Sequence, residues 1–247
     1  MLLFYIFLAS FAGALVSKPL RIDPILIILP SSLLLSADTL SFLNVFISLF
    51  PCLLLFSLSL VFPNRKELEV ERITRMAAGV SLGSFIGVQC LFLLPFSLTS
   101  LVLLMAVGAV LSLTFSRYRW LNSLSISGPL SLWSGLILGI GQTICLGVGG
   151  WILSGLHQLS PVNRYVLWCM ALIGALIGFV ALPPNEVSYG IYWPVVLANG
   201  LGLAIGALVL KYVLVSRFES KVLQWTVLAM CFSVWGHVLV KHFILPS

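Results

Sequence analysis

The sequence predicts an all-α protein that crosses a membrane many times. Hydrophobic residues make up 60% of the 247 residues and charged residues only 8%, and the mean hydropathy is +1.16. Soluble globular domains carry about 25% charged residues, so the composition excludes a soluble domain. The formal net charge of +6 is interpreted as a signal of membrane orientation, because Lys and Arg are enriched in cytoplasmic loops.

Polar residues divide the chain into ten apolar segments. Eight of them are long enough to cross a hydrocarbon core of ~30 Å, whereas the second and the seventh are short or broken. The first segment lacks the basic start of a signal peptide and is interpreted as a retained span. The segments are expected near residues 1–17, 24–36, 40–62, 76–94, 97–115, 124–146, 148–159, 163–182, 188–210 and 222–240.

The distribution of Lys and Arg indicates how the short segments run. If both cross and the N-terminus lies outside, every Lys and Arg except Lys241 falls on the cytoplasmic side. If both are re-entrant, six of these charges move outside, namely Lys18, Arg21, Arg164, Lys211, Arg217 and Lys221. The positive-inside rule therefore favours ten crossing segments. The mixed-charge stretch 63–75 is expected to form a solvated cytoplasmic turn or a helix start.

Similar spacings recur in the two halves of the chain at an offset of about 122 to 124 residues. Gly13 corresponds to Gly135, and the pair Gly79 and Gly83 corresponds to the pair Gly202 and Gly206. An odd number of crossings in each half makes the second copy inverted, as in many secondary transporters. We therefore predict two inverted-topology repeats of about five segments each, with eight full spans and two short or broken segments, over residues 1–119 and 120–247.

The glycine-rich stretch 134–161 predicts an interrupted helix at membrane depth. Non-helical backbone is tolerated there only where it is buried in protein or lines a cavity, so such an interruption indicates a transporter's substrate site. Free backbone N–H groups at a helix start favour an anion. The predicted substrate-binding residues are Asn44, Gln142, Thr143, Gly147, Gly149 and Gly150. The alternative is that the glycines only permit close helix packing.

Other polar residues within the spans do not indicate catalysis. Asn44, Gln89 and Asn199 each either bond one helix to another or belong to the transport path, and interhelical bonding is favoured for each. No long span carries Asp or Glu near its middle, so the usual carboxylate of a proton relay is missing. The three His residues lack the spacing of a metal site or a base. We expect no enzyme activity, no metal and no cofactor.

The order of these motifs resembles the sulfite exporter TauE/SafE family of membrane permeases over nearly the whole chain. Each half opens with a Gly-containing span (SFAGALVS, WSGLILGIG), continues with a short Gly- or Pro-rich segment, and then has a Gly-x-x-x-Gly helix (GVSLGSFIG, GLGLAIGAL). The family's small-Thr-Ser/Asn element is degraded here, since SFLNVFIS keeps only Asn44 and RYVLWCMA has Trp168 and Cys169. The resemblance implies export of sulfite, an organosulfonate or a related small anion.

Two functions of different classes follow from the sequence. The first is a secondary transporter, with export expected, of a small anion such as sulfite, an organosulfonate or a related carboxylate in the cell inner (cytoplasmic) membrane. The alternative is a non-transporting membrane scaffold or assembly subunit with the same fold. The expected partners are the lipid bilayer and a small anionic substrate, without nucleic acid, and a homo-oligomer is left open. A channel is not favoured, because the spans offer no ring of polar side chains.

Overall fold

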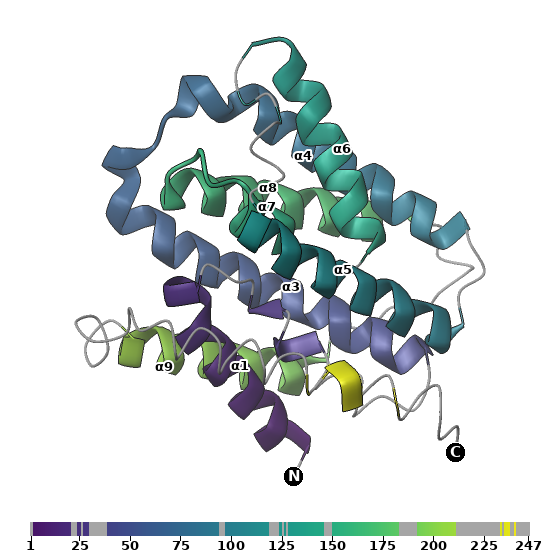
Figure 1. Ribbon diagram of the computed structural model, residues 1–247. Coiled ribbons are helices and arrows are strands. Elements are labelled where there is room, and N and C mark those ends of the chain that lie inside the picture. The colour runs from purple at the N-terminus through teal and green to yellow at the C-terminus, as the bar shows by residue number, and fades with distance from the viewer. Residues whose placement is uncertain are drawn as a thin grey trace. The chain divides into compact units, whose positions relative to one another are not determined.

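A computed structural model shows helices as the regular structure of the residues that it describes (Figure 1). These residues are 2–20, 24–25, 27–29, 39–93, 97–118, 124, 126, 128–145, 150–182, 192–210, 233, 235–237 and 240. In chain order the elements are α1 (Leu2–Leu20), α3 (Thr39–Val61), the 3-10 helix η1 (Phe62–Glu67), α4 (Val70–Leu93), α5 (Leu98–Tyr118), α6 (Leu130–Ile144), α7 (Gly150–Gly155), α8 (Pro161–Val180) and α9 (Trp193–Val209).

Three of the described helical segments are long and apolar enough to cross a membrane: Leu43–Asn64, Val70–Leu93 and Pro161–Val180. Shorter apolar helices cover Leu3–Leu15, Ser100–Leu111, Leu130–Ile144 and Trp193–Val209. The predicted tenth segment, 222–240, lies almost entirely outside the described residues, and so does most of the second, 24–36.

Several predicted boundaries change, and two of them bear on the packing described below. Helix α4 begins at Val70, before residue 76, so the mixed-charge stretch 63–75 forms η1 and the first turns of α4; its helix-start interpretation is confirmed. The prediction that the sixth segment begins at residue 124 is wrong, because α6 begins at Leu130. Gly128 has a positive φ of 80°, which favours glycine, and Pro129 follows it as the N-cap of α6. The Gly-Pro pair therefore sets the start of this helix.

The chain divides into two compact units. The first contains Met1–Cys52, Ser97–Ala106 and Tyr189–Ser247, and the second contains Leu53–Phe96 and Val107–Ser188. Each unit draws on both halves of the sequence, so the units do not follow the division at residue 119. The two predicted repeats stay a prediction.

In the second unit, α4 and α6 pack through small residues. Gly79 and Gly83 lie against the carbonyl oxygens of Leu132 and Leu136, and a methyl group added to Gly87 would lie 2.8 Å from Thr143 Cβ. Such contacts leave no room for a side chain, and they are typical of membrane helices. The contacting residues advance together along both helices, so α4 and α6 run parallel.

Helix α8 packs against α4 and is parallel to it as well (Figure 1). Near the start of both helices, Asn163 Oδ1 accepts a hydrogen bond from the N–H of Glu69 at 3.1 Å. Near their ends, Gln89 Nε2 donates to the Gly178 carbonyl at 2.8 Å. Because α6 and α8 both run parallel to α4, residues 145–160 must return from the end of α6 to the end at which α6 begins.

The first unit repeats this arrangement with α9 at its centre. A methyl group added to Gly202 would lie 2.5 Å from the Phe7 carbonyl oxygen of α1, and one at Gly206 would lie 2.7 Å from Ala14 Cβ. On α3, Ser48 Oγ accepts from the Tyr192 N–H at 3.0 Å, and Cys52 Sγ donates to the Val196 carbonyl at 3.1 Å. Helices α1 and α3 are thus both parallel to α9.

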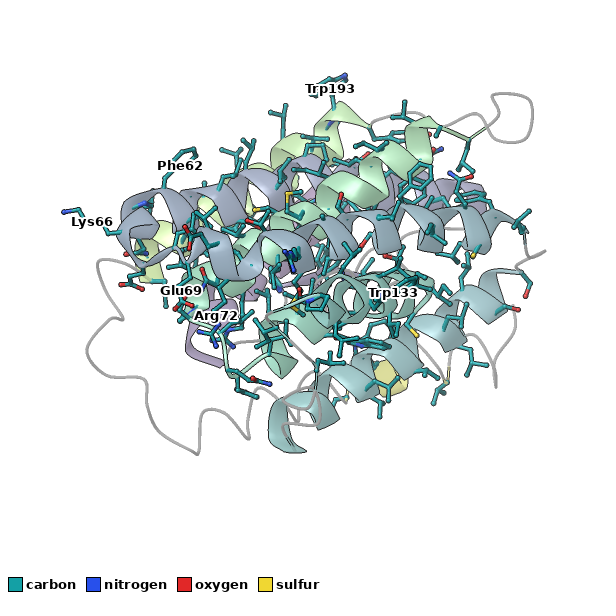
Figure 2. All side chains as sticks on the ribbon, turned by 90° about the horizontal axis from the view of Figure 1, so that it is seen from above. Phe62, Lys66, Glu69, Arg72, Trp133 and Trp193 are labelled. Atoms are coloured by element: carbon teal, nitrogen blue, oxygen red, sulfur yellow. The ribbon has the colours of Figure 1, made fainter. Side chains whose placement is uncertain are left out.

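The outer faces of these helices carry large apolar side chains. On α6 the buried positions include Ser131, Gly135 and Gly139, whereas Trp133 and Ile137 are exposed. On α9 the buried positions include Asn199, Gly202 and Gly206, whereas exposed positions include Leu197, Leu201 and Trp193, which projects from its helix in Figure 2. Small residues inside and large apolar residues outside suit a lipid surround, because soluble proteins rarely expose apolar faces of this extent.

The packing of α4 on α6 predicts a stability difference between neighbouring residues. Gly83→Val should lower the unfolding temperature in detergent micelles, because the new methyl groups meet the backbone of Leu136 and overpacking costs about 1–3 kcal/mol. Leu82→Val is the matched control, since Leu82 is exposed, and it should change the unfolding temperature little. Equal unfolding temperatures for the two variants would contradict this packing.

Candidate functional site

The predicted interruption of the helix is present after α6. The helix ends at Ile144, and the Cys145 N–H closes its last turn on the Gly141 carbonyl at 3.1 Å. Helical structure resumes at Gly150, as the six-residue α7. The intervening residues 146–149, which include Gly147 and Gly149, lie outside the described residues. The break therefore separates the end of α6 from a short helix that belongs to the returning stretch.

Three buried polar side chains of α4 and α6 lie just before the break. Gln142 and Thr143 occupy the last turn of α6 and are 0% and 2% exposed. Ser84 of α4 is 0% exposed, and its backbone N would lie 2.8 Å from a methyl group on Gly139. Because Thr143 is one turn beyond Gly139 and packs on Gly87, Ser84 and Thr143 lie within about one helical turn of each other along the α4–α6 contact.

Two of these side chains carry hydroxyl groups without a partner. Within the described part of the chain, Ser84 Oγ and Thr143 Oγ1 make no hydrogen bond. Other buried serines bond to a carbonyl of the preceding turn: Ser48 to Asn44 at 2.7 Å and Ser57 to Leu53 at 2.6 Å. A buried polar group without a partner costs about 1–3 kcal/mol, and native proteins contain few of them. Two such hydroxyls beside one interruption make this contact the candidate site, with uncharged donors.

Helix α7 is held at the break by two side chains. Trp151 Nε1 donates to the Gly108 carbonyl of α5 at 3.3 Å, and its ring covers Gly141, where a methyl group would lie 2.6 Å from Cζ3. Two residues further on, the Leu153 carbonyl accepts from Nη1 of Arg164 at 2.8 Å. Side chains thus secure a segment that its own short run of backbone hydrogen bonds could not hold.

The structure places some of the predicted site residues at the break and one of them elsewhere. Gln142 and Thr143 lie side by side in the sequence and are both buried at the break, and Gly150 begins α7. Asn44 is buried in the part of α3 that belongs to the first unit, where its carbonyl accepts from Ser48. Whether these residues bind a substrate stays a prediction.

The interhelical interpretation is confirmed for two amides. Gln89 bonds α4 to Gly178 of α8, and Asn199 Oδ1 accepts from Ser10 Oγ of α1. The Asn199 amide also donates to the Val195 carbonyl at 2.9 Å. Both amides therefore serve packing between helices.

Ser84 was not among the residues predicted from the sequence. It stands among several serines in apolar segments, and the signal that could have identified it is its place between Gly83 and Gly87 on the small-residue face of α4.

The described residues contain no group of three or more His, Cys, Asp or Glu side chains that could hold a metal ion. The chemistry available at the break is hydrogen bonding by hydroxyl and amide groups.

Comparisons with models of protein families, with curated proteins and with solved structures find no match. The resemblance to the TauE/SafE family stays a prediction.

The unpartnered hydroxyls predict an unusual stability effect. Thr143→Val should leave the unfolding temperature in detergent unchanged or raise it, because valine has nearly the same shape and removes a polar group whose burial costs about 1 kcal/mol or more. Ser10→Ala is the comparison, since it removes the donor to buried Asn199 and should lower the unfolding temperature. A loss of stability as large for Thr143→Val as for Ser10→Ala would show that the Thr143 hydroxyl has a structural role.

Proposed function

We propose that this chain is a multi-pass transporter of the cell inner membrane that exports a small anion such as sulfite, an organosulfonate or a related carboxylate. The observation that carries this proposal is the pair of buried, unpartnered hydroxyls of Ser84 and Thr143 beside the interruption of α6. Burying two hydroxyls without partners costs folding free energy, and a scaffold has no use for such groups. A substrate that accepts hydrogen bonds would supply the missing partners.

The proposed topology has ten crossing segments in two inverted repeats. Matched packing supports it: the glycine pair of α4 lies against α6 as the glycine pair of α9 lies against α1, with the same spacing. Helix α8 packs on α4, and α3 is bonded to α9 through Ser48 and Cys52. The starts of α4 and α9, Val70 and Trp193, are 193 − 70 = 123 residues apart, which agrees with the offset expected from the sequence. The parallel directions of α6 and α8 also favour a seventh segment that crosses.

The distribution of charge favours an anion that moves outward. Among the described α-helices only α4 contains an acidic residue, Glu71 in its first turn, so no carboxylate in these spans repels an anion or binds a coupling cation. With the cell interior negative, each negative charge that leaves gains ~2.3 kcal/mol per 100 mV. Voltage alone could therefore drive export.

One observation favours the scaffold alternative. The segment that departs from the family's polar element, around Trp168 and Cys169, is buried in α8 at 0% and 5% exposure. Large side chains at these positions fill space and leave little room for a substrate there. In the proposed transporter, the site therefore lies at the α4–α6 contact.

The test is anion flux into proteoliposomes with an imposed voltage, with sulfite, sulfate, a two-carbon sulfonate and a short carboxylate compared. Flux of one of them should be competed by its analogues and should fall at least tenfold in Thr143→Val and Ser84→Ala. The control is Ser131→Ala, at the other end of α6, where the hydroxyl bonds to the Gly128 carbonyl; it should keep most of the flux. No flux of any anion by folded wild-type protein would refute the transporter and favour the scaffold.

A further inference from the structure

The helices that form the candidate site carry no charged side chain near it. Residues 76–116, 120–163 and 165–185 contain no Asp, Glu, Lys or Arg. These stretches supply α4 beyond its first turns, most of α5, all of α6 and α7, and α8 apart from Arg164. The hydrogen-bond donors that Ser84 and Thr143 present are therefore neutral groups in an uncharged part of the chain.

The charges of α4 gather near its start, away from Ser84. Figure 2 shows Lys66, Glu69 and Arg72 at this end, where Glu69 and Arg72 form an ion pair at 2.7 Å. The last charged residue of the helix, Arg75, is exposed and stands 84 − 75 = 9 residues before Ser84, which is ~14 Å at the helical rise. This separation exceeds the Debye length of ~8 Å at physiological ionic strength, so Arg75 attracts a substrate at Ser84 only weakly.

The charged positions of α5 and α8 are also removed from the break. Gly108 of α5 lies against Cys145 at the end of α6, and Arg117 follows 117 − 108 = 9 residues later. Gly174 of α8 lies against α4, and Arg164 stands 174 − 164 = 10 residues before it. Nine and ten residues of helix span ~14 and ~15 Å. The segments of these helices that lie against α4 and α6 near the break thus carry no charge.

A site without charge discriminates between anions by their own charge. Taking an ion out of water costs a free energy that rises with the square of its charge, so a dianion costs about four times as much as a monoanion of the same size. Voltage favours export only in direct proportion to the charge. Two hydroxyls donate two hydrogen bonds whichever ion is bound, so they do not offset the additional cost of a dianion.

We infer that the contact at Ser84 and Thr143 selects singly charged oxyanions and rejects doubly charged ones. An organosulfonate, hydrogensulfite or a monocarboxylate is carried. Sulfate and the sulfite dianion are rejected, although their oxygens accept the same hydrogen bonds. This inference rests on the proposed function and narrows its substrate class to monoanions.

The test compares two ethyl compounds of similar shape in proteoliposomes at a fixed imposed voltage. Ethanesulfonate stays singly charged, whereas ethylphosphonate changes from a monoanion to a dianion as the pH rises through its second pKa. Ethylphosphonate should compete with the flux of labelled ethanesulfonate well below that pKa, and at least tenfold less effectively well above it. Competition by methanesulfonate should be the same at both pH values. This control corrects for titration of the protein's own groups, which in these segments are Cys90, Cys145, His157, Tyr165 and Cys169.

Thr143→Lys tests whether this contact sets the selectivity. An ammonium group there offsets the second negative charge, so the ethylphosphonate dianion should compete at least tenfold better than in wild-type protein. Ser131→Lys is the matched control, since Ser131 lies 143 − 131 = 12 residues earlier in α6, or ~18 Å away along the helix, and it should leave the competition unchanged. Unchanged competition in Thr143→Lys overturns the assignment to this contact. So does failure of Thr143→Lys to fold where Thr143→Val folds, because a site that admits substrate has room for the lysine.

The outcomes separate this inference from the proposed function. If the ethylphosphonate dianion competes as well as the monoanion, or if sulfate is carried in place of ethanesulfonate, the inference is overturned while the transporter stands. Absence of flux of every anion refutes the proposed function and this inference with it. Flux of ethanesulfonate that only singly charged analogues reduce supports both.

Discussion

The close backbone approach of α4 to α6 and α8 is the contact on which the second unit depends. It requires glycine or another small residue wherever the helices touch, so the large apolar side chains of α6 are left on the outside. That distribution is stable only where the surroundings are themselves apolar, because in water the outer face would drive association. In the first unit, α9 makes the same kind of contact with α1. The small residues that allow the helices to pack closely therefore also leave the large apolar side chains on the outer surface.

Parallel packing also explains why interrupted segments occur. When α6 and α8 both run alongside α4 in one direction, the chain between them has only residues 145–160 with which to return. A straight helix of 16 residues covers ~24 Å, and turns at both ends use part of this length, so α7 is left short. Side chains fix the described part of this stretch to its neighbours, since Trp151 donates to the Gly108 carbonyl of α5 and Arg164 donates to the Leu153 carbonyl of α7. The same return creates the break beside Thr143 and the buried first turn of α8.

Composition and spacing were sufficient to predict the helical structure of the described residues, a short seventh segment, the break after α6 and the bonding roles of Gln89 and Asn199. They were not sufficient for the start of α6, because an apolar run from residue 124 conceals the Gly-Pro pair that ends the preceding turn. Nor could they indicate Ser84, Asn163 or the burial of Arg164. Whether a hydroxyl or an amide has a partner depends on which helix packs against it, and that information is absent from a single apolar segment.

The central claim is that the stretch between α6 and α8 crosses the membrane, and its most direct test is the sidedness of two cysteines, each introduced alone into a cysteine-free background. An impermeant thiol reagent applied outside intact cells should label Pro184→Cys and leave Gln158→Cys protected until the membrane is opened. A re-entrant seventh segment requires the reverse, with Gln158→Cys labelled from outside and Pro184→Cys protected. That reversed pattern would contradict the proposed ten-segment topology.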